Sequence, residues 1–286
     1  MVETDYYDES CNLSFFEQAF SEQRCIGKGS FGEVFKALSK DDHRWYAVKI
    51  SMEPFRSTGD REKKLREVQK HELLPKHPNL VSFVRAWEEL GFLYIQTELC
   101  QCSLFDYKLK VGEIIESELW SFFADMALAV RYLHSHGLLH LDIKPQNVMV
   151  SFNGICKLGD FSLVLDIEKD SKNEEEGDGK YLAPEVLQYG ADKPCDIFSL
   201  GMTMIDICTD LELPSNGELW HGFRRNNIDH QFTKDMPQML LNAVLPLLEM
   251  DPKKRPTADE ICCFPMLANI IQQRKVSMSK FFMMLG

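Results

Sequence analysis

Short runs of apolar and polar residues alternate over the first hundred positions, and this pattern predicts a β-rich region. Five runs have the length and the β-branched and aromatic content of strands, and they are residues 24–29, 33–38, 45–51, 82–87 and 92–99. A helical pattern interrupts them at residues 60–74, where Leu65, Val68 and Leu73 lie near one face. We therefore expect a sheet accompanied by one main helix.

Helical patterns dominate after residue 100. The longest covers residues 117–137, with Ser117 as the predicted N-cap and Gly137 just past the end. Residues 195–210 are nearly all apolar, which is typical of a helix buried on every side. A β-rich front and a helical back predict an α+β fold of two lobes.

The predicted organisation is one domain with short extensions at its ends. A small β-rich N-lobe with one main helix is expected to join a larger α-helical C-lobe through a hinge. The predicted parts are an N-terminal extension at 1–19, a domain at 20–272 (N-lobe 20–99, hinge 98–102, C-lobe 103–272) and a C-terminal tail at 273–286.

Composition narrows the class of protein. The chain has 286 residues, enough for two lobes, and its 44% hydrophobic and 27% charged content is that of a soluble globular protein. With 32 basic and 44 acidic side chains, the formal charge of −12 argues against a nucleic-acid partner. The acidic start MVETDYYDES is no signal peptide, and no run of 18 apolar residues predicts a transmembrane segment. Nine cysteines without a CxxC pair indicate reduced thiols of an intracellular protein.

A glycine-rich segment, GKGSFGEV at residues 27–34, lies between two predicted strands. Glycine allows the main chain to approach phosphates and to offer N–H donors. A dinucleotide-binding turn would need a helix after the glycines, whereas a strand pattern follows here. The segment therefore predicts a β-hairpin over nucleotide phosphates, although a tight turn without a ligand remains open from this motif alone.

Lys49 lies within the apolar run YAVKI of a predicted strand. A lysine there must reach solvent or find an anion, and ATP phosphates would supply one. Glu67 on the following helix is the candidate counter-ion, with Glu72 on the same helix as the alternative. A surface lysine on an edge strand is the other interpretation of Lys49.

Three further motifs follow in order: HLDIKPQNVMV at 140–150, CKLGDFS at 156–162 and LAPE at 182–185. Together with the glycine-rich segment and Lys49, they resemble the signature set of the eukaryotic protein kinases, over residues 20–272. The resemblance implies ATP and Mg²⁺ as cofactors and phosphoryl transfer through a highly charged transition state.

The resemblance also implies a role for each conserved position of that set. Asp142 would orient the acceptor hydroxyl, and Lys144 and Lys49 would neutralise phosphate charge. Asn147 and Asp160 would hold Mg²⁺ through the oxygen ligands it prefers. The nucleotide-binding residues would be Ile26, Gly27, Lys28, Gly29, Ser30, Phe31, Gly32, Val34, Ala47, Lys49, Glu67, Thr97, Glu98 and Cys100.

Individual residues of this set have expected places around the nucleotide. Val34 and Ala47 would form the apolar sandwich of the adenine, and Thr97 would lie behind it. Glu98 and Cys100 would offer main-chain groups of the hinge to the adenine edge. In the C-lobe, we expect Glu185 to pair with Arg255, and Asp196 to cap the main chain of the catalytic loop.

A closer resemblance is to the Wee-type kinases, in the segments LGDFSLVLDI, EGDGKYLAPEVL, DIFSLGMTM and LELPSNGELW. The segments RWYAVKISMEPFRSTGDREKKLREV, HPNLVSFVRAWEE and YIQTELC are similar to the membrane-associated tyrosine/threonine (Myt) branch. Members phosphorylate neighbouring Thr and Tyr residues in the glycine loop of a cyclin-dependent kinase, which holds cells out of mitosis.

The resemblance therefore implies a cyclin-dependent kinase–cyclin complex as protein partner and inhibition of entry into mitosis or meiosis. A monomer is the default expectation. The expected location is the cytoplasm or nucleus, or the ER or Golgi membrane if this chain lacks an anchor.

Rival interpretations remain. Ser162 replaces the glycine of the DFG motif, which raises the possibility of a pseudokinase scaffold, although Lys49, Asp142, Asn147 and Asp160 are all present. Lys144 belongs to the Ser/Thr type of catalytic loop, so an ordinary Ser/Thr kinase with another substrate stays open. The LAPE segment disfavours a kinase of small molecules or lipids.

Leu141 stands where most kinases carry an arginine that binds an activation-loop phosphate. Leucine cannot bind a phosphate, so we predict activity without phosphorylation of that loop. The check is to produce the protein in bacteria, treat it with phosphatase and assay it. Loss of all activity on dephosphorylation would contradict the prediction.

Overall fold

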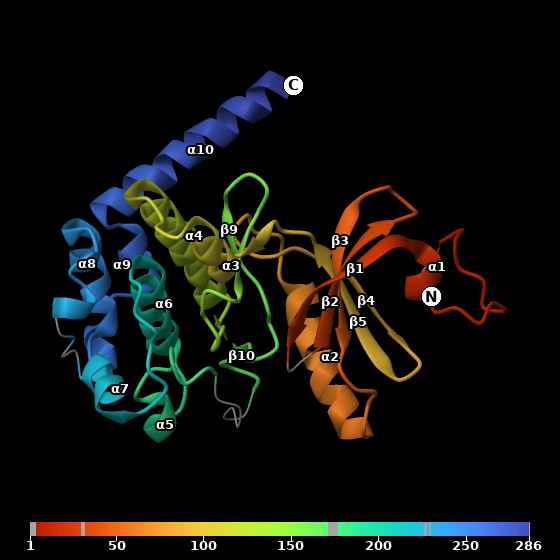
Figure 1. Ribbon diagram of the computed structural model, residues 1–286, viewed down its shortest axis with the longest axis horizontal. Helices are drawn as coiled ribbons and strands as arrows, with labels where there is room; N and C mark the ends of the chain where they lie inside the picture. The colour runs from red at the N-terminus through yellow and green to blue at the C-terminus, as the bar shows by residue number, and fades with distance from the viewer. Residues whose placement is uncertain (1–3, 30–31, 171–176, 226–227, 229, 286) are drawn as a thin grey trace. The chain divides into compact units, whose positions relative to one another are not determined.

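The computed structural model describes residues 4–29, 32–170, 177–225, 228 and 230–285, with the main chain alone at 67 and 276–285 (Figure 1). It divides into two compact units. The β-rich unit comprises Met1–Lys76 and Val81–Cys100, and the helical unit comprises His77–Leu80 and Gln101–Gly286. The predicted α+β organisation, a sheet-bearing N-lobe and a helical C-lobe, is confirmed.

The β-rich unit is built on one antiparallel sheet with the strand order β1-β2-β3-β5-β4. The strands are β1 (Phe20–Gly29), β2 (Gly32–Ser39), β3 (Trp45–Ser51), β4 (Phe83–Glu89) and β5 (Phe92–Glu98). Helix α2 (Thr58–Leu73) begins after Ser57, whose side chain accepts a hydrogen bond from the Asp60 N–H. Val68 of α2 is buried against the sheet, whereas the prediction for Leu73 is wrong, because this last residue of the helix is 79% exposed.

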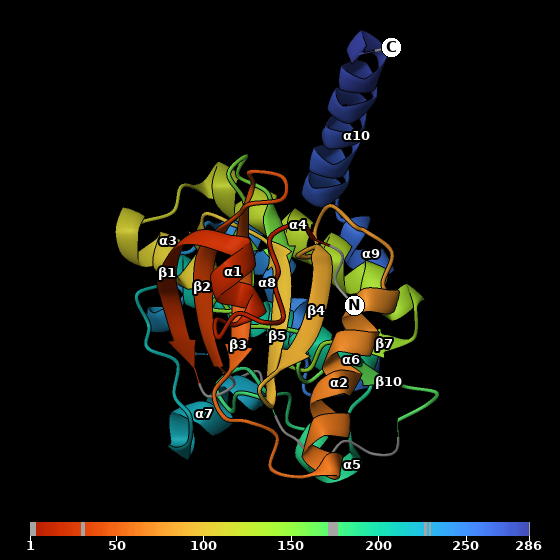
Figure 2. The same cartoon turned by 90° about the vertical axis from the view of Figure 1, so that its right-hand side faces the viewer.

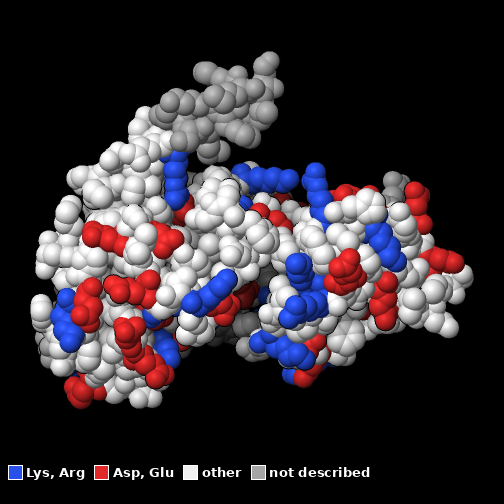
Figure 3. Space-filling model, turned by 45° about the horizontal axis from the view of Figure 1, so that its top comes forward, with Lys and Arg blue, Asp and Glu red and all other residues white. Residues whose placement is uncertain are grey.

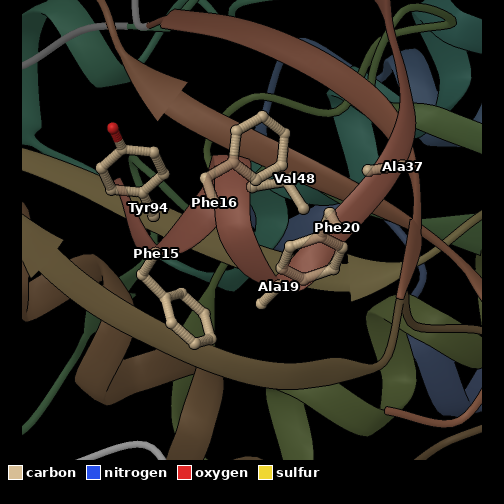
Figure 4. Close-up of a cluster of buried hydrophobic side chains, with 7 residues drawn as sticks. All are labelled: Phe15, Phe16, Ala19, Phe20, Ala37, Val48 and Tyr94. Atoms are coloured by element: carbon tan, nitrogen blue, oxygen red, sulfur yellow. The ribbon is translucent and has the colours of Figure 1, made fainter. Parts of the chain in front are cut away.

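A short helix, α1 (Phe15–Ala19), covers the other face of the sheet (Figure 2). A capping box between Ser14 and Glu17 begins it. Figure 4 shows the resulting core, in which α1 and the start of β1 meet the sheet; its buried members are Phe15, Phe16, Ala19, Phe20, Ala37, Val48 and Tyr94. The segment before residue 20 is thus part of the core of this unit, a role that the sequence pattern did not indicate.

In the part of the chain that the structure describes, the helical unit contains eight helices, two small sheets and three 3₁₀ turns. The helices are α3 (Leu104–Val111), α4 (Glu116–Ser135), α5 (Val186–Tyr189), α6 (Lys193–Cys208), α7 (Gly217–Arg224), α8 (Gln238–Val244), α9 (Ala258–Cys262) and α10 (Pro265–Leu285). The 3₁₀ turns are His230–Phe232, Leu245–Leu248 and Pro252–Lys254. The strands are β6 (Cys102–Ser103), β7 (Leu138–Leu139), β8 (Val148–Val150), β9 (Cys156–Leu158) and β10 (Leu165–Asp166).

Helices α4 and α6 form the centre of this unit. Helix α6 is buried along most of its length, as its apolar sequence predicts. A Cβ at Gly201 would lie 2.8 Å from Leu248 Cδ2, so this glycine permits the close approach of the turn Leu245–Leu248. Helix α4 begins one residue before Ser117, with Ile115 in the N-cap position, so Ser117 is not the N-cap.

The C-terminal helix α10 is tied to the helical unit by an ion pair between Arg274 and the fully buried Asp125 of α4. Asp125 also accepts hydrogen bonds from Asn79 Nδ2 at 2.7 Å and from the Cys156 N–H at 2.9 Å. The predicted tail therefore continues a helix that starts at Pro265.

The surface charges agree with the acidic composition. On the face drawn in Figure 3, Lys and Arg side chains are interspersed with Asp and Glu side chains and do not form one continuous basic field. None of the described helices combines the length and the apolar character that crossing a membrane requires.

Replacing Phe16 by alanine tests whether α1 belongs to the core. Phe16 is 4% exposed and packs on Phe20 and Tyr94 with ring centroids 5.4 and 6.1 Å apart. Phe16→Ala is expected to lower the free energy of unfolding by about 3–5 kcal/mol, because it leaves a cavity in the cluster. Denaturant unfolding followed by intrinsic fluorescence measures the change.

The matched control is Leu13→Ala, because Leu13 precedes α1 and is 52% exposed. Its expected effect is within about 0.5 kcal/mol. Equal effects of the two substitutions would contradict a core role for α1.

Candidate functional site

The predicted nucleotide-binding residues of the β-rich unit gather on one face of its sheet. In the register of β1, β2 and β3, Gly27 lies opposite Val34, and Val34 lies opposite Lys49. Ala47, two residues before Lys49, pairs with Thr97 of β5. Cross-strand partners, and residues two apart on one strand, project to the same face. The α1 cluster contains Val48, which projects to the other face, so this face carries Val34, Ala47, Lys49 and Thr97.

The glycine-rich hairpin is shaped by close contact with β3. Gly29 and Gly32 pair at its end, and a Cβ on Gly32 would lie 2.2 Å from the Ile50 carbonyl oxygen. Only glycine fits there. Lys28 Nζ lies 2.5 Å from Glu33 Oε1 across the hairpin, and this hydrogen-bonded pair raises the pKa of Lys28.

Three predicted nucleotide-binding residues lie wholly or partly outside the part of the chain that the structure describes. Ser30 and Phe31 lie outside the described residues. Glu67 lies in α2, but its side chain is outside the description, so its pairing with Lys49 stays a prediction. Ile26 lies on β1 and is 50% exposed.

Hydrogen bonds at the end of β5 hold the predicted hinge residues of the β-rich unit. The Glu98 N–H donates to the Ser82 carbonyl at 3.0 Å, and Glu98 Oε1 accepts from the Ser82 N–H at 2.7 Å. Thr97 Oγ1 donates to the Glu98 carbonyl at 3.3 Å, and Cys100 is buried. These bonds hold the main chain that the prediction assigns to the adenine edge.

In the helical unit, one buried carboxylate organises the catalytic loop. Asp196, in the first turn of α6, accepts hydrogen bonds from the His140 N–H at 2.8 Å and from the Leu141 N–H at 2.9 Å. Its Oδ2 also lies 3.0 Å from His134 Nε2. Burial alone would raise the pKa of Asp196, but the hydrogen bond and charge of His134, with those of His140, outweigh it and lower the pKa. The predicted capping role of Asp196 is confirmed.

The loop held by Asp196 bends sharply. Leu141 has φ 65°, a left-handed conformation that is unusual for a residue other than glycine. His140 is fully buried, and its Nε2 lies 3.0 Å from the Gly159 carbonyl. Asp142 is the next residue after this bend, so its main chain continues directly from the two residues that Asp196 holds. His134, which completes the anchor, was not singled out from the sequence, because no local pattern links it to residue 196.

The predicted catalytic residue Lys144 and the predicted metal ligand Asn147 both contact the carboxylate of Asp142. Asn147 Nδ2 donates to Asp142 Oδ2 at 2.7 Å and to the Asp142 carbonyl at 2.9 Å. Lys144 Nζ lies 2.9 Å from the same Oδ2. Asp142 is 6% exposed, so its negative charge is held by an ammonium and an amide in a buried setting. The structure therefore brings Asp142, Lys144 and Asn147 together.

Asp160 follows β9 at a point that is tied to the same loop. The Gly159 N–H donates to the Asn147 carbonyl at 2.9 Å, and Asp160 itself has φ 56°. The Ser162 N–H donates to Asp160 Oδ1 at 3.4 Å. Ser162 Oγ is buried and has no hydrogen-bond partner among the described residues.

The donor set fits Mg²⁺. Both side-chain hydrogen bonds of Asn147 use its NH₂ group, so its amide oxygen is the atom that can ligate a cation. With the Asp160 carboxylate, the site offers the hard oxygen atoms that Mg²⁺ prefers. No cluster of three or more His, Cys, Asp or Glu side chains suited to a metal occurs in the described part of the chain. Mg²⁺ in kinases is usually bound by one or two protein side chains together with substrate phosphates and water.

A segment that the sequence analysis did not assign to the site also touches Asp142. The Asp178 N–H donates to Asp142 Oδ1 at 3.3 Å, and Asp178 Oδ2 lies 3.8 Å from Lys144 Nζ. Lys144 thus has two carboxylates within reach. The sequence does not indicate this contact, because Asp142 and Asp178 are 36 positions apart in the chain.

The predicted pair of Glu185 and Arg255 is confirmed. Arg255 Nη1 lies 2.5 Å from Glu185 Oε1, and Nη2 donates to Oε2 at 2.8 Å. Arg255 also donates to the main-chain carbonyls of Glu249 and Pro194. This bidentate ion pair holds Glu185, the end of the LAPE segment, to Arg255, which also binds the first turn of α6.

Comparisons with known proteins identify the family of the chain. A family model described as "Protein kinase domain" matches residues 20–267. The chain is 45% identical, over 96% of its length, to "Membrane-associated tyrosine- and threonine-specific cdc2-inhibitory kinase wee-1.3" of Caenorhabditis elegans. It is 39% identical, over 96% of its length, to "Membrane-associated tyrosine- and threonine-specific cdc2-inhibitory kinase" of Drosophila melanogaster. It is 30% identical, over 93% of its length, to "Mitosis inhibitor protein kinase wee1" of Schizosaccharomyces pombe.

The match covers only part of each relative. The chain spans 40% of the nematode protein, 51% of the fly protein and 33% of the yeast protein. The match of the family model begins at the predicted domain start, residue 20, whereas the predicted domain end at 272 and the hinge at 98–102 stay predictions.

Replacing Asp196 by asparagine tests the anchor of the catalytic loop. The new NH₂ group would face N–H donors in a fully buried place, so we expect a loss of about 3–5 kcal/mol in the free energy of unfolding at neutral pH. Because the pKa of Asp196 is lowered in the fold, its contribution is present above the ordinary value of 3.8 and is lost as the pH falls through the lower, folded value. Denaturant unfolding measures the difference.

Asp192→Asn is the matched control, because Asp192 is the exposed N-cap residue of the same helix and asparagine caps equally well. If Asp196→Asn were no more destabilising than Asp192→Asn, the anchoring role would be wrong.

Proposed function

Because this chain belongs to the protein kinase family, and within it to the Wee-type kinases, we propose that it transfers the γ-phosphoryl group of ATP to a hydroxyl of a protein substrate. The observation that carries the proposal is the convergence on Asp142. Its Oδ2 is 2.7 Å from Asn147 Nδ2 and 2.9 Å from Lys144 Nζ.

Asp142 would receive the acceptor. Its buried carboxylate can accept a hydrogen bond from the substrate hydroxyl and take up the proton as the oxygen attacks phosphorus. The new bond joins the acceptor oxygen to the γ-phosphorus, and the bond from that phosphorus to the β–γ bridging oxygen breaks, which leaves ADP. Lys144 would neutralise charge on the transferring group, and its contact with Asp142 keeps it at the reacting atoms.

The cofactors are ATP and Mg²⁺. Bound Mg²⁺ supplies positive charge that offsets the charge on the phosphates. Asn147 and Asp160 would hold the metal, and Lys49 would bind phosphate oxygens. Val34, Ala47 and Thr97 would contact the adenine, because they share a sheet face with Lys49. The main-chain N–H groups of the glycine-rich hairpin would bind phosphates.

The proposed substrate is a cyclin-dependent kinase, in its complex with a cyclin. The relatives are named as tyrosine- and threonine-specific cdc2-inhibitory kinases, which supports a Thr, a Tyr or both in the substrate's glycine loop as acceptors. Phosphorylation there would inhibit entry into mitosis or meiosis. We propose that the chain acts as a monomer inside the cell, in the cytoplasm or nucleus, or at the ER or Golgi membrane if it belongs to an anchored protein.

The test is transfer from ATP-Mg²⁺ to a purified, catalytically inactive cyclin-dependent kinase–cyclin complex, with mass spectrometry to locate the phosphate. Phosphate is expected on the glycine-loop Thr, Tyr or both. Asp142→Asn is expected to lower the turnover number by about 10²- to 10⁴-fold, because it removes the proton acceptor. Asp259→Asn on the exposed surface of α9 is the control, with unchanged turnover.

Phosphate on generic substrates alone would contradict the proposed substrate and retain the kinase activity. An ATP-binding chain that transfers no phosphate to any protein would contradict the activity itself and indicate a scaffold.

A further inference from the structure

Four successive main-chain carbonyls of residues 179–182 each accept a hydrogen bond from a side chain of α6 or α7. Gly179 accepts from Trp220 Nε1 at 2.9 Å and from Arg224 Nη2 at 2.7 Å. Lys180 and Leu182 accept from Arg224 at 3.2 and 3.1 Å. The remaining carbonyl, that of Tyr181, accepts from Ser199 Oγ at 3.0 Å. We call residues 177–182 the acceptor strip.

Arg224 is the centre of this arrangement. Its side chain is 3% exposed and stacks on the Trp220 ring, with 3.8 Å from Cζ to the centroid. Burial lowers the pKa of Arg224 to about 10, so the guanidinium keeps its charge at neutral pH. Its hydrogen bonds in the described part of the chain go to main-chain carbonyls, of residues 179, 180, 182 and 220. A buried charge held by carbonyl dipoles rather than a carboxylate needs each of those carbonyls in place.

The other end of the acceptor strip lies on the catalytic loop. A Cβ on Gly177 would lie 2.1 Å from the Leu141 carbonyl oxygen, so the main chain here is in direct contact with that loop. The next residue, Asp178, donates its N–H to Asp142 Oδ1 and shares Lys144 with Asp142. Each of residues 178–182 is therefore hydrogen-bonded to Asp142, to α6 or to α7.

A third set of bonds stiffens the strip from within. The Tyr181 and Leu182 N–H groups both donate to the Asp178 carbonyl, at 2.9 and 3.1 Å. The Tyr181 hydroxyl donates to Asp206 of α6. A displacement of residues 179–182 would therefore move Asp178, and with it the hydrogen bond to Asp142.

We propose that Trp220 and Arg224 are positioning residues that hold the acceptor strip, and through Asp178 the Asp142 carboxylate, in the geometry for phosphoryl transfer. They do so with neutral carbonyl acceptors and without a phosphate on the strip. Leu141 offers no charge at the catalytic loop, so the holding groups come from α7 instead. This inference rests on the proposed kinase function and assigns two further residues to it.

Two substitutions test the hold of Trp220 and Arg224 on the acceptor strip, one by a small change and one by a larger change. Trp220→Phe keeps an aromatic ring beside Arg224 but removes the indole N–H donor. Arg224→Lys keeps the positive charge but replaces a planar guanidinium, which donates from Nε, Nη1 and Nη2, by an ammonium whose donors share one nitrogen and cannot reproduce the spread of those atoms. Arg225→Lys is the matched control, because it makes the same change at the adjacent, exposed residue.

The kinetic readout separates positioning from folding. With unphosphorylated protein, as mass spectrometry verifies, turnover of the protein substrate is expected to fall by about 10- to 100-fold in Arg224→Lys, because the strip shifts relative to Asp142. The KM for ATP should stay within about twofold of the parent value, because nucleotide binding uses other residues. Arg225→Lys should match the parent.

Amide hydrogen exchange supplies a readout that does not need activity. The amides of Tyr181 and Leu182 are expected to exchange about fivefold faster or more in Trp220→Phe, because one hydrogen bond that fixes Gly179 is lost. Amides of α4 should exchange as in the parent. If Arg224→Lys fails to fold, Trp220→Phe alone decides the outcome.

Unchanged turnover and unchanged exchange in a folded variant would overturn the proposal. So would a parent protein whose activity requires a phosphate on the strip. A parent protein that transfers no phosphate would contradict the proposed function. Faster exchange in Trp220→Phe would in that case still support the role of Trp220 and Arg224 in holding the acceptor strip.

Discussion

The buried carboxylate of Asp196 is the constraint on which the catalytic geometry depends. It accepts two successive main-chain N–H groups, of His140 and Leu141, and a ring nitrogen of His134. Those bonds stabilise a left-handed residue, Leu141, that would otherwise be strained. Asp142 comes directly after this bend, and Asn147 and Lys144 both contact its carboxylate. The Asp196 carboxylate can be buried away from solvent because these hydrogen-bond donors compensate for its lost hydration.

In the β-rich unit the two faces of the sheet differ, and the predicted nucleotide-binding residues lie on one of them. The aromatic cluster of α1 covers one face with Phe15, Phe16 and Phe20. The opposite face keeps Val34, Ala47 and Lys49 in register. The short helix before the sheet therefore has a functional consequence, because it buries one face and leaves the other to carry the predicted nucleotide residues.

The predictable parts were those with local signals. The apolar run of α6, the strands β2 and β3 and the glycine-rich hairpin all follow from periodicity or from a motif. The parts that escaped prediction depend on contacts between distant residues. Helix α1 has only five residues, and its N-terminus is held by Glu89, 74 positions from Phe15. Trp220 and Arg224 donate to carbonyls 41 to 45 positions away, and the periodicity of their own helix does not indicate those partners. Spacing along a chain cannot report such distances.

We propose that the groups around Asp142 carry out phosphoryl transfer and do not merely bind nucleotide. A rapid-quench single turnover, with the protein in excess over ATP labelled on its γ-phosphate, distinguishes transfer from binding. In the presence of Mg²⁺ and the cyclin-dependent kinase–cyclin complex, ADP and labelled substrate are expected to form together and in equal amounts. Recovery of intact ATP from the protein, or of free phosphate without labelled substrate, would contradict it.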